Sequence, residues 1–107
     1  MAYVLKQAKN GKFHFNLKAA NHQVILTSEL YDTEAAAKNG IASVQKNGTD
    51  EKNFEVKTAK DGQFYFSLKA GNGQIIGSSE MYKTEASAKN GIASVTKNAG
   101  STEVTSA

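Results

Sequence analysis

The sequence predicts an α+β fold made of two copies of one unit, in which three β-strands precede an α-helix. The chain matches itself without a gap when it is shifted by 51 residues, with 28 identities over the 45 positions that pair 3–47 with 54–98. Each copy shows a stretch of period-two hydrophobic alternation and then an apolar stripe at helical spacing. Two copies are too few for a solenoid, so a closed arrangement with pseudo-two-fold symmetry is expected.

Each copy begins with a predicted β-hairpin. The first strands are expected at Tyr3–Ala8 and Phe54–Thr58. Asn10-Gly11 and Asp61-Gly62 follow them, and these dipeptides favour a tight hairpin because both positions tolerate positive φ. The next segments, KFHFNLKA and QFYFSLKA, alternate with period two and predict a strand with one apolar and one polar face. In the first copy the apolar side comprises Phe13, Phe15, Leu17 and Ala19, and the polar side comprises Lys12, His14, Asn16 and Lys18.

A second turn and a third strand follow in each copy. The turn is expected at Ala20-Asn21 in the first copy and at Gly71-Asn72-Gly73 in the second. The two asparagines of these turns are expected in left-handed positions, which this residue type tolerates. The third strands are QVILTS and QIIGSS.

A helix closes each copy. Thr33 and Thr84 are expected to cap the free N–H groups at the helix starts. The helices are expected to end near Asn47-Gly48 and near 98–100, where glycine would supply a left-handed C-cap. The apolar stripes comprise Ala37, Ile41 and Val44 in one helix, and Ala88, Ile92 and Val95 in the other.

Both helices contain an internal glycine. The heptapeptide KNGIASV, at 38–44 and 89–95, places Gly40 and Gly91 beside the apolar stripe. Glycine costs a helix interior about 1 kcal/mol relative to alanine. Close approach of each helix to the sheet, or to its twin helix, explains this choice. A site formed where the two glycine-bearing surfaces meet is the alternative.

Length and composition predict a single domain, 1–107, built from repeat 1 (1–50) and repeat 2 (51–107). A half of this size is marginal for a core of its own. No apolar run approaches the roughly 18 residues of a membrane span, and no secretory signal is recognised. Cysteine is absent. We therefore expect a cytoplasmic protein without a membrane partner, and a monomer with internal dimer-like symmetry.

Three segments recur in both copies as a set: F-x-F-x-L-K-A-x-N, S-E-x-Y-x-T and K-N-G-I-A-S-V. Together they resemble the YegP-like family of small uncharacterised bacterial proteins, and the resemblance runs from Tyr3 to Asn98. It implies tandem β-β-β-α(-β) units forming one antiparallel sheet with both helices on one face, and with the strand after each helix exchanged between units. It also implies a strand in STEVT at 101–105 and a double role for the linker TDEKNFEVK. It implies no established activity.

The residues predict neither an enzyme nor a cofactor or metal site. His14 and His22 become Tyr65 and Gly73 in the second copy, so we expect both histidines to be solvent-exposed without a catalytic part. No neighbouring His or Cys could complete a zinc site, and the aspartates lack the spacing of a calcium loop. The Gly-x-Gly of GNGQIIG lies between two strands, which is the wrong context for a dinucleotide site.

Some polar identities recur in both copies, either as a doubled binding surface or as the trace of a recent duplication. Our interpretation favours structural or historical causes. The pairs are Lys18/Lys69, Asn21/Asn72, Gln23/Gln74, Ser28/Ser79, Glu29/Glu80, Tyr31/Tyr82 and Lys38/Lys89.

The favoured function is a small non-enzymatic binding or interaction module, with an unidentified ligand on a sheet face that the helices leave uncovered. The alternative is weak, sequence-independent binding of single-stranded nucleic acid, since the net charge is +3 and an aromatic could stack a base. All 13 basic residues are lysines, which disfavours a committed nucleic-acid binder. Continuous positive charge on the open face would favour nucleic-acid binding. Interspersed positive and negative charges would favour the non-enzymatic binding module. The tentative binding surface comprises Lys12, His14, Lys18, Gln23, Tyr65, Lys69 and Gln74.

Overall fold

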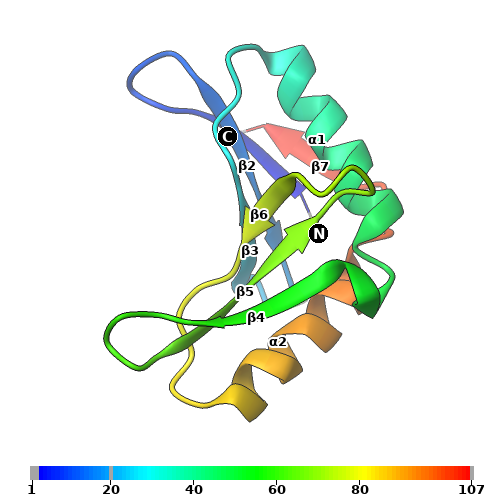
Figure 1. The fold of residues 1–107 in the computed structure, drawn as a ribbon. Helices are drawn as coiled ribbons and strands as arrows, with labels where there is room; N and C mark the ends of the chain where they lie inside the picture. The colour runs from blue at the N-terminus through cyan, green and yellow to red at the C-terminus, as the bar shows by residue number, and fades with distance from the viewer. Residues whose placement is uncertain (1–2, 20, 107) are drawn as a thin grey trace.

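The computed structural model describes residues 3–19 and 21–106, and these residues form one sheet of seven strands and two α-helices (Figure 1). The strand order is β4-β5-β6-β3-β2-β1-β7. In chain order the elements are β1 (Tyr3–Gln7), β2 (Phe13–Lys18), β3 (Val24–Ser28), α1 (Glu34–Asn47), the 3₁₀ helix η1 (Glu51–Asn53), β4 (Phe54–Thr58), β5 (Phe64–Lys69), β6 (Ile75–Ser78), α2 (Glu85–Asn98) and β7 (Val104–Ser106).

The predicted α+β fold is confirmed, with both helices on one face of the sheet and the other face bare (Figure 1). The third strands of the two repeats, β3 and β6, pair antiparallel at the centre, so the sheet is continuous across the pseudo-two-fold axis. Thr33 and Thr84 cap the helices as expected, each accepting a hydrogen bond of 3.0 Å from a backbone N–H of the first turn. Within the described residues, neither helix is long and apolar enough to cross a membrane.

The last strand is exchanged between repeats, but its direction differs from the expectation. β7 follows α2 and pairs with β1 of the other repeat. This pairing is parallel, whereas all neighbouring strands among β1 to β6 pair antiparallel. The sheet is therefore mixed. The end of α2 lies beside the start of β1, where the Tyr3 hydroxyl donates to the Ala99 carbonyl at 2.6 Å, and the chain therefore runs along β1 in the same direction. β7 also begins at Val104, later than the predicted 101–105.

The linker between the repeats has the expected double role, although only its second half is a strand. Asp50 caps η1 by accepting from the Lys52 backbone N–H at 3.0 Å. The Phe54 backbone N–H then donates to the Glu51 carbonyl, and β4 begins. β4 serves both as the segment after α1 and as the first strand of repeat 2, where it pairs with β5.

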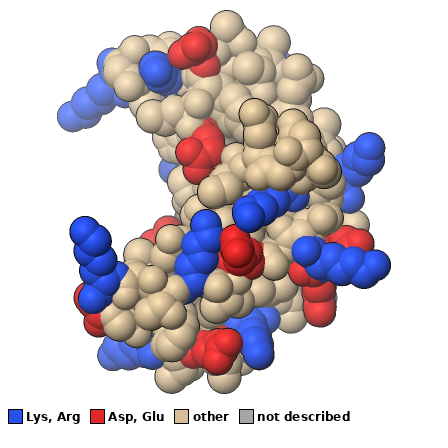
Figure 2. Space-filling model, in the orientation of Figure 1, with Lys and Arg blue, Asp and Glu red and all other residues tan. Residues whose placement is uncertain are grey.

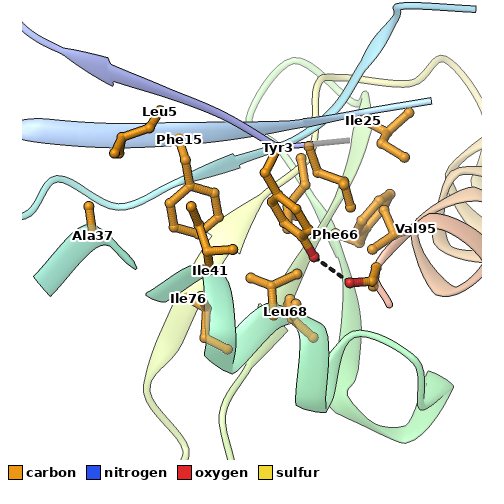
Figure 3. Close-up of a cluster of buried hydrophobic side chains, with 14 of the residues drawn as sticks. Tyr3, Leu5, Phe15, Ile25, Ala37, Ile41, Phe66, Leu68, Ile76 and Val95 are labelled. Carbon is orange, nitrogen blue, oxygen red and sulfur yellow. Dashed lines mark hydrogen bonds between the residues drawn. The ribbon is translucent and has the colours of Figure 1, made fainter. Parts of the chain in front are cut away.

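The hydrophobic core contains side chains from both repeats (Figure 3). Phe15 and Ile41 of repeat 1 lie in the same cluster as Phe66 and Val95 of repeat 2. The helix ends meet near the axis, since a Cβ on Gly48 would lie 2.8 Å from the Cβ of Ala99, its equivalent in the repeat.

The predicted left-handed C-cap is wrong. Gly48 has φ −73° and Ala99 has φ −61°, so both caps continue in the right-handed region. Both residues are buried. Gly48 is explained by the close contact with Ala99 and not by backbone conformation.

The hairpin turns contain three residues and not two. The Gly11 backbone N–H donates to the Ala8 carbonyl at 3.0 Å, and the Ala8 N–H donates to the Lys12 carbonyl at 2.7 Å. Gly11 alone takes a positive φ, +84°, while Asn10 accepts the Lys12 N–H on its side-chain oxygen. This is a right-handed turn closed by one left-handed glycine. Gly62 in repeat 2 has the same conformation, with φ +86°.

The second turns also differ from the prediction at their asparagines. The left-handed residues are His22, with φ +67°, and Gly73, with φ +83°. Asn21 and Asn72 instead accept the backbone N–H of Gln23 and Gln74, both at 3.0 Å. Ala20, which the predicted turn includes, lies outside the described residues.

Each internal glycine lets a tyrosine lie between helix and sheet. A Cβ on Gly40 would clash with the Tyr31 hydroxyl and lie 3.0 Å from the Phe15 ring. A Cβ on Gly91 would lie 2.5 Å from the Tyr82 hydroxyl and 2.9 Å from the Phe66 ring. The predicted close approach of each helix to the sheet is therefore confirmed, and the glycines contact the aromatic rings that lie on the helix side of the sheet. The glycines contact separate tyrosines, so they form no joint site.

We predict that Gly91→Leu lowers the free energy of unfolding by about 1–3 kcal/mol, because the new side chain overpacks the space that Tyr82 occupies. Equilibrium denaturation monitored by circular dichroism measures this change. Asn90→Leu is the matched control, since Asn90 is the exposed neighbour on the same helix. Equal denaturation midpoints for wild type and Gly91→Leu would rule out the close-packing explanation.

Candidate binding face

The sheet face opposite the helices, called the open face below, has a polar row at its centre. Asn16, Thr27, Ser78 and Ser67 are successive cross-strand partners on β2, β3, β6 and β5. The Asn16 side-chain amide donates to the Thr27 hydroxyl at 3.0 Å, and the hydroxyls of Ser67 and Ser78 lie 3.4 Å apart. Asn16 and Ser67 are only 6% and 1% exposed, whereas Thr27 and Ser78 at the centre of the row are partly exposed.

The open face is concave. The hairpins β1–β2 and β4–β5 project away from the helices as two arms, and the central strands lie between them (Figure 1). The space-filling view shows a hollow in the outline of the molecule between these arms (Figure 2). The central strands β3 and β6, which carry Thr27 and Ser78, lie at the bottom of the hollow.

Two exposed apolar side chains occupy equivalent places beside the arms. Leu30 is 54% exposed and Met81 is 52% exposed. Each precedes a tyrosine that pairs with the neighbouring strand, Tyr31 with Phe13 and Tyr82 with Phe64. Those tyrosines point to the helix side, where their hydroxyls lie beside Gly40 and Gly91. Leu30 and Met81 lie outside the strands, directly before these tyrosines, and their side chains are exposed.

His14 and Tyr65 occupy equivalent positions on β2 and β5, between residues that point to the helix side. Both are half-buried, so the prediction of a solvent-exposed His14 is wrong. The Nδ1 atom of His14 is buried and has no hydrogen-bond partner within the described chain. His22 is exposed, as expected.

Acidic and basic side chains lie on both arms, on either side of the polar row. Lys12 lies 3.5 Å from Asp32 on the first arm. Glu55 on the second arm lies 3.0 Å from Lys69 and 3.8 Å from Lys57. A hydrogen bond from Lys69 and the positive charges of both lysines lower the pKa of Glu55. Acidic and basic side chains are also interspersed over the surface in Figure 2.

The structure brings together only part of the predicted binding surface. His14 and Lys18 lie on β2, and Tyr65 and Lys69 lie on β5, with β3 and β6 between the two pairs. Lys12 directly precedes β2.

Gln23 and Gln74 belong to the turns instead. Their side-chain oxygens accept from Asn21 at 3.3 Å and from Asn72 at 3.5 Å, so they help to close each turn. The prediction missed Leu30 and Met81, although both are apolar and both stand directly before the recurring tyrosine.

Most of the other recurring polar residues have structural roles. The Ser28 hydroxyl accepts the Phe15 backbone N–H at 2.9 Å and donates to the Glu29 carbonyl at 2.8 Å, and Ser79 makes the equivalent bonds. Lys38 lies 3.8 Å from Glu34, one helical turn away. These contacts support the structural interpretation of the recurrence.

Tyr31 and Tyr82 have raised pKa values. Burial against the helix is the larger cause, and the negative charges of Glu29 and Glu80 add to it. Both tyrosines therefore stay neutral around pH 7 and act as packing groups. Over residues 3–19 and 21–106, no three carboxylate or imidazole side chains lie close enough together to hold a metal ion.

The fold and the open face define a tandem-repeat α+β protein with a concave, uncovered sheet face. The chain belongs to the family described as domain of unknown function (DUF1508), which matches residues 8–55 and again 59–105. The two matches correspond to the two repeats, and the YegP-like resemblance is confirmed.

Bacterial relatives match over most of their length. A UPF0339 protein of Pasteurella multocida is 67% identical over 102 residues, covering 95% of this chain and 90% of the relative. The UPF0339 protein YegP of Yersinia pestis is 54% identical over 102 residues, with 95% and 91% covered. These names give no activity or ligand.

Two solved structures share the fold. The solution NMR structure of yegP from E. coli, a protein of unknown function, is 50% identical with a TM-score of 0.92, covering 99% of this chain and 93% of that one. The solution NMR structure of the UPF0339 protein SO3888 from Shewanella oneidensis is 47% identical, also with a TM-score of 0.92, covering 98% and 89%.

Proposed function

We propose that this chain is a non-enzymatic binding module whose ligand lies on the open face, between the two arms. The exposure of Leu30 and Met81 at equivalent positions is the observation that carries the proposal. Neither side chain belongs to the hydrophobic core, yet an apolar residue stands there in both repeats. Exposed apolar surface rimmed by polar groups is typical of interaction sites.

The open face offers complementary contacts to such a ligand. Burying an exposed leucine or methionine side chain contributes about 1.5–3 kcal/mol each. His14 and Tyr65 lie on the same face and can contribute flat, partly apolar surfaces. The polar row between them can orient polar groups of the ligand. We place this activity in the cytoplasm, in keeping with the composition.

The charge pattern favours this module over nucleic-acid binding. Lysines on both arms have carboxylates within 4 Å, as in the pairs Lys12–Asp32 and Lys69–Glu55. A nucleic-acid surface needs lysines that are free to replace the counterions of phosphates. The interspersed signs on the open face therefore support a ligand held by apolar and polar contacts.

We predict that Leu30→Ser combined with Met81→Ser removes the binding partner in affinity capture from a bacterial lysate, because both apolar contacts are lost. Circular dichroism should show an intact fold, since both side chains are more than half exposed. Val104→Ser is the matched control, because Val104 is also an exposed apolar residue but lies on β7 near α1. A partner that the double variant retains at the wild-type level would contradict the proposed site.

We also predict that nucleic-acid binding is weak and sequence-independent. Any affinity for labelled single-stranded oligonucleotides should largely disappear between about 50 and about 200 mM salt, because only lysine–phosphate contacts are available. Fluorescence anisotropy with single- and double-stranded probes measures this. Submicromolar, sequence-selective binding that survives the higher salt would reverse the ranking of the two functions.

A further inference from the structure

The two outer edges of the repeats are not equivalent. β1 is covered on its outer side by β7, whereas β4, the equivalent strand of repeat 2, ends the described sheet. An uncovered edge strand presents backbone N–H and C=O groups that another strand can pair with. β4 therefore has an unpaired outer edge at a position where repeat 1 is completed by a seventh strand.

The register identifies the backbone groups on this edge. On β1 the Tyr3 N–H points outward and donates to the Glu103 carbonyl at 3.1 Å. Alternate residues of a strand point the same way, so the equivalent outward residues of β4 are Phe54, Val56 and Thr58. The Phe54 N–H is already donated to Glu51. The Phe54 C=O and both backbone groups of Val56 face outward, and no strand of the described residues lies beside them.

The side chains of β4 are complementary to a second β4 in the antiparallel direction. In the sequence Phe-Glu-Val-Lys-Thr, pairing centred on Val56 sets Glu55 of each copy opposite Lys57 of the other. Opposite charges in cross-strand positions stabilise a sheet. The covered strand β1 has Val4 and Lys6 at these positions, so its sequence lacks this complementarity.

We propose that β4 pairs antiparallel with β4 of a second copy of this chain, so that the two sheets become one across a two-fold axis at Val56. The two Val56 residues exchange both backbone hydrogen bonds. The Thr58 N–H of each copy donates to the Phe54 C=O of the other, a group that η1 leaves free. The pairing uses the outer backbone edge of β4 with the Glu55 and Lys57 side chains, whereas the proposed ligand contacts are Leu30, Met81 and the polar row, so each proposal can fail without the other.

The helix side of this edge also fits a neighbouring strand. A groove of about 350 Å³ lies beside β4 and is lined by Glu51, Val56, Lys89 and Ile92. On the other edge, β7 places Val104 and Ser106 in the equivalent groove along α1. A second copy on β4 extends the wall of the groove in the same way and shields Val56 from water.

The internal symmetry led us to expect a monomer, whereas the β4 edge predicts a reversible dimer. Sedimentation equilibrium at low salt, with protein concentrations up to about 1 mM, decides between the two. Glu55→Lys and Lys57→Glu should each raise the dissociation constant at least about tenfold, because each places like charges opposite one another. The double swap Glu55→Lys/Lys57→Glu should restore the wild-type constant.

Two further variants complete the test. Val56→Pro should abolish the dimer with the fold intact, because the lost N–H points away from β5. Lys6→Glu, at the position equivalent to Lys57 on the covered strand, should leave the dissociation constant unchanged. Amide NMR spectra check the fold of each variant. A chain that stays monomeric at about 1 mM, or a double swap that fails to restore the dimer, would overturn the proposal.

Discussion

The contact between a helix glycine and a tyrosine ring determines how each repeat is built. Gly40 and Gly91 have no side chain, so Tyr31 and Tyr82 fit between the helix and the phenylalanine ring on which each stacks, at centroid distances of 6.3 and 6.2 Å. Through this contact, each tyrosine holds the segment after the third strand against the helix. The apolar residue directly before each tyrosine takes no part in this contact and is exposed. The packing of the core and the candidate site therefore meet at adjacent residues.

A single continuous chain cannot complete two identical halves. The linker after α1 must cross to repeat 2, and it does so through η1, whose Glu51 carbonyl takes the Phe54 N–H. The segment after α2 instead extends as β7 along β1. The pseudo-two-fold axis thus organises the core, where Gly48 meets Ala99, while the two outer edges differ.

The internal repeat and the hydrophobic periodicities predicted most of the architecture, because both reflect interactions between residues that are close in sequence. The threonine caps and β4 at Phe54–Thr58 follow from residue type and spacing. The direction of β7 depends on where α2 ends in space, which no local pattern encodes. The exposure of Leu30 and the partial burial of His14 were missed because both depend on tertiary packing, which no local pattern encodes. The left-handed C-cap failed since a tertiary contact at Gly48 overrode the usual role of glycine.

The central claim is that the two repeats share one core and form one cooperative unit, on which the open face depends. Native-state hydrogen exchange at increasing denaturant tests it most directly, because it reports the opening free energy of individual amides. We expect the protected amides of β2 and β3 to merge with those of β5 and β6 into one global unfolding reaction. Amides of one repeat that open at a distinctly lower free energy than those of the other would contradict it.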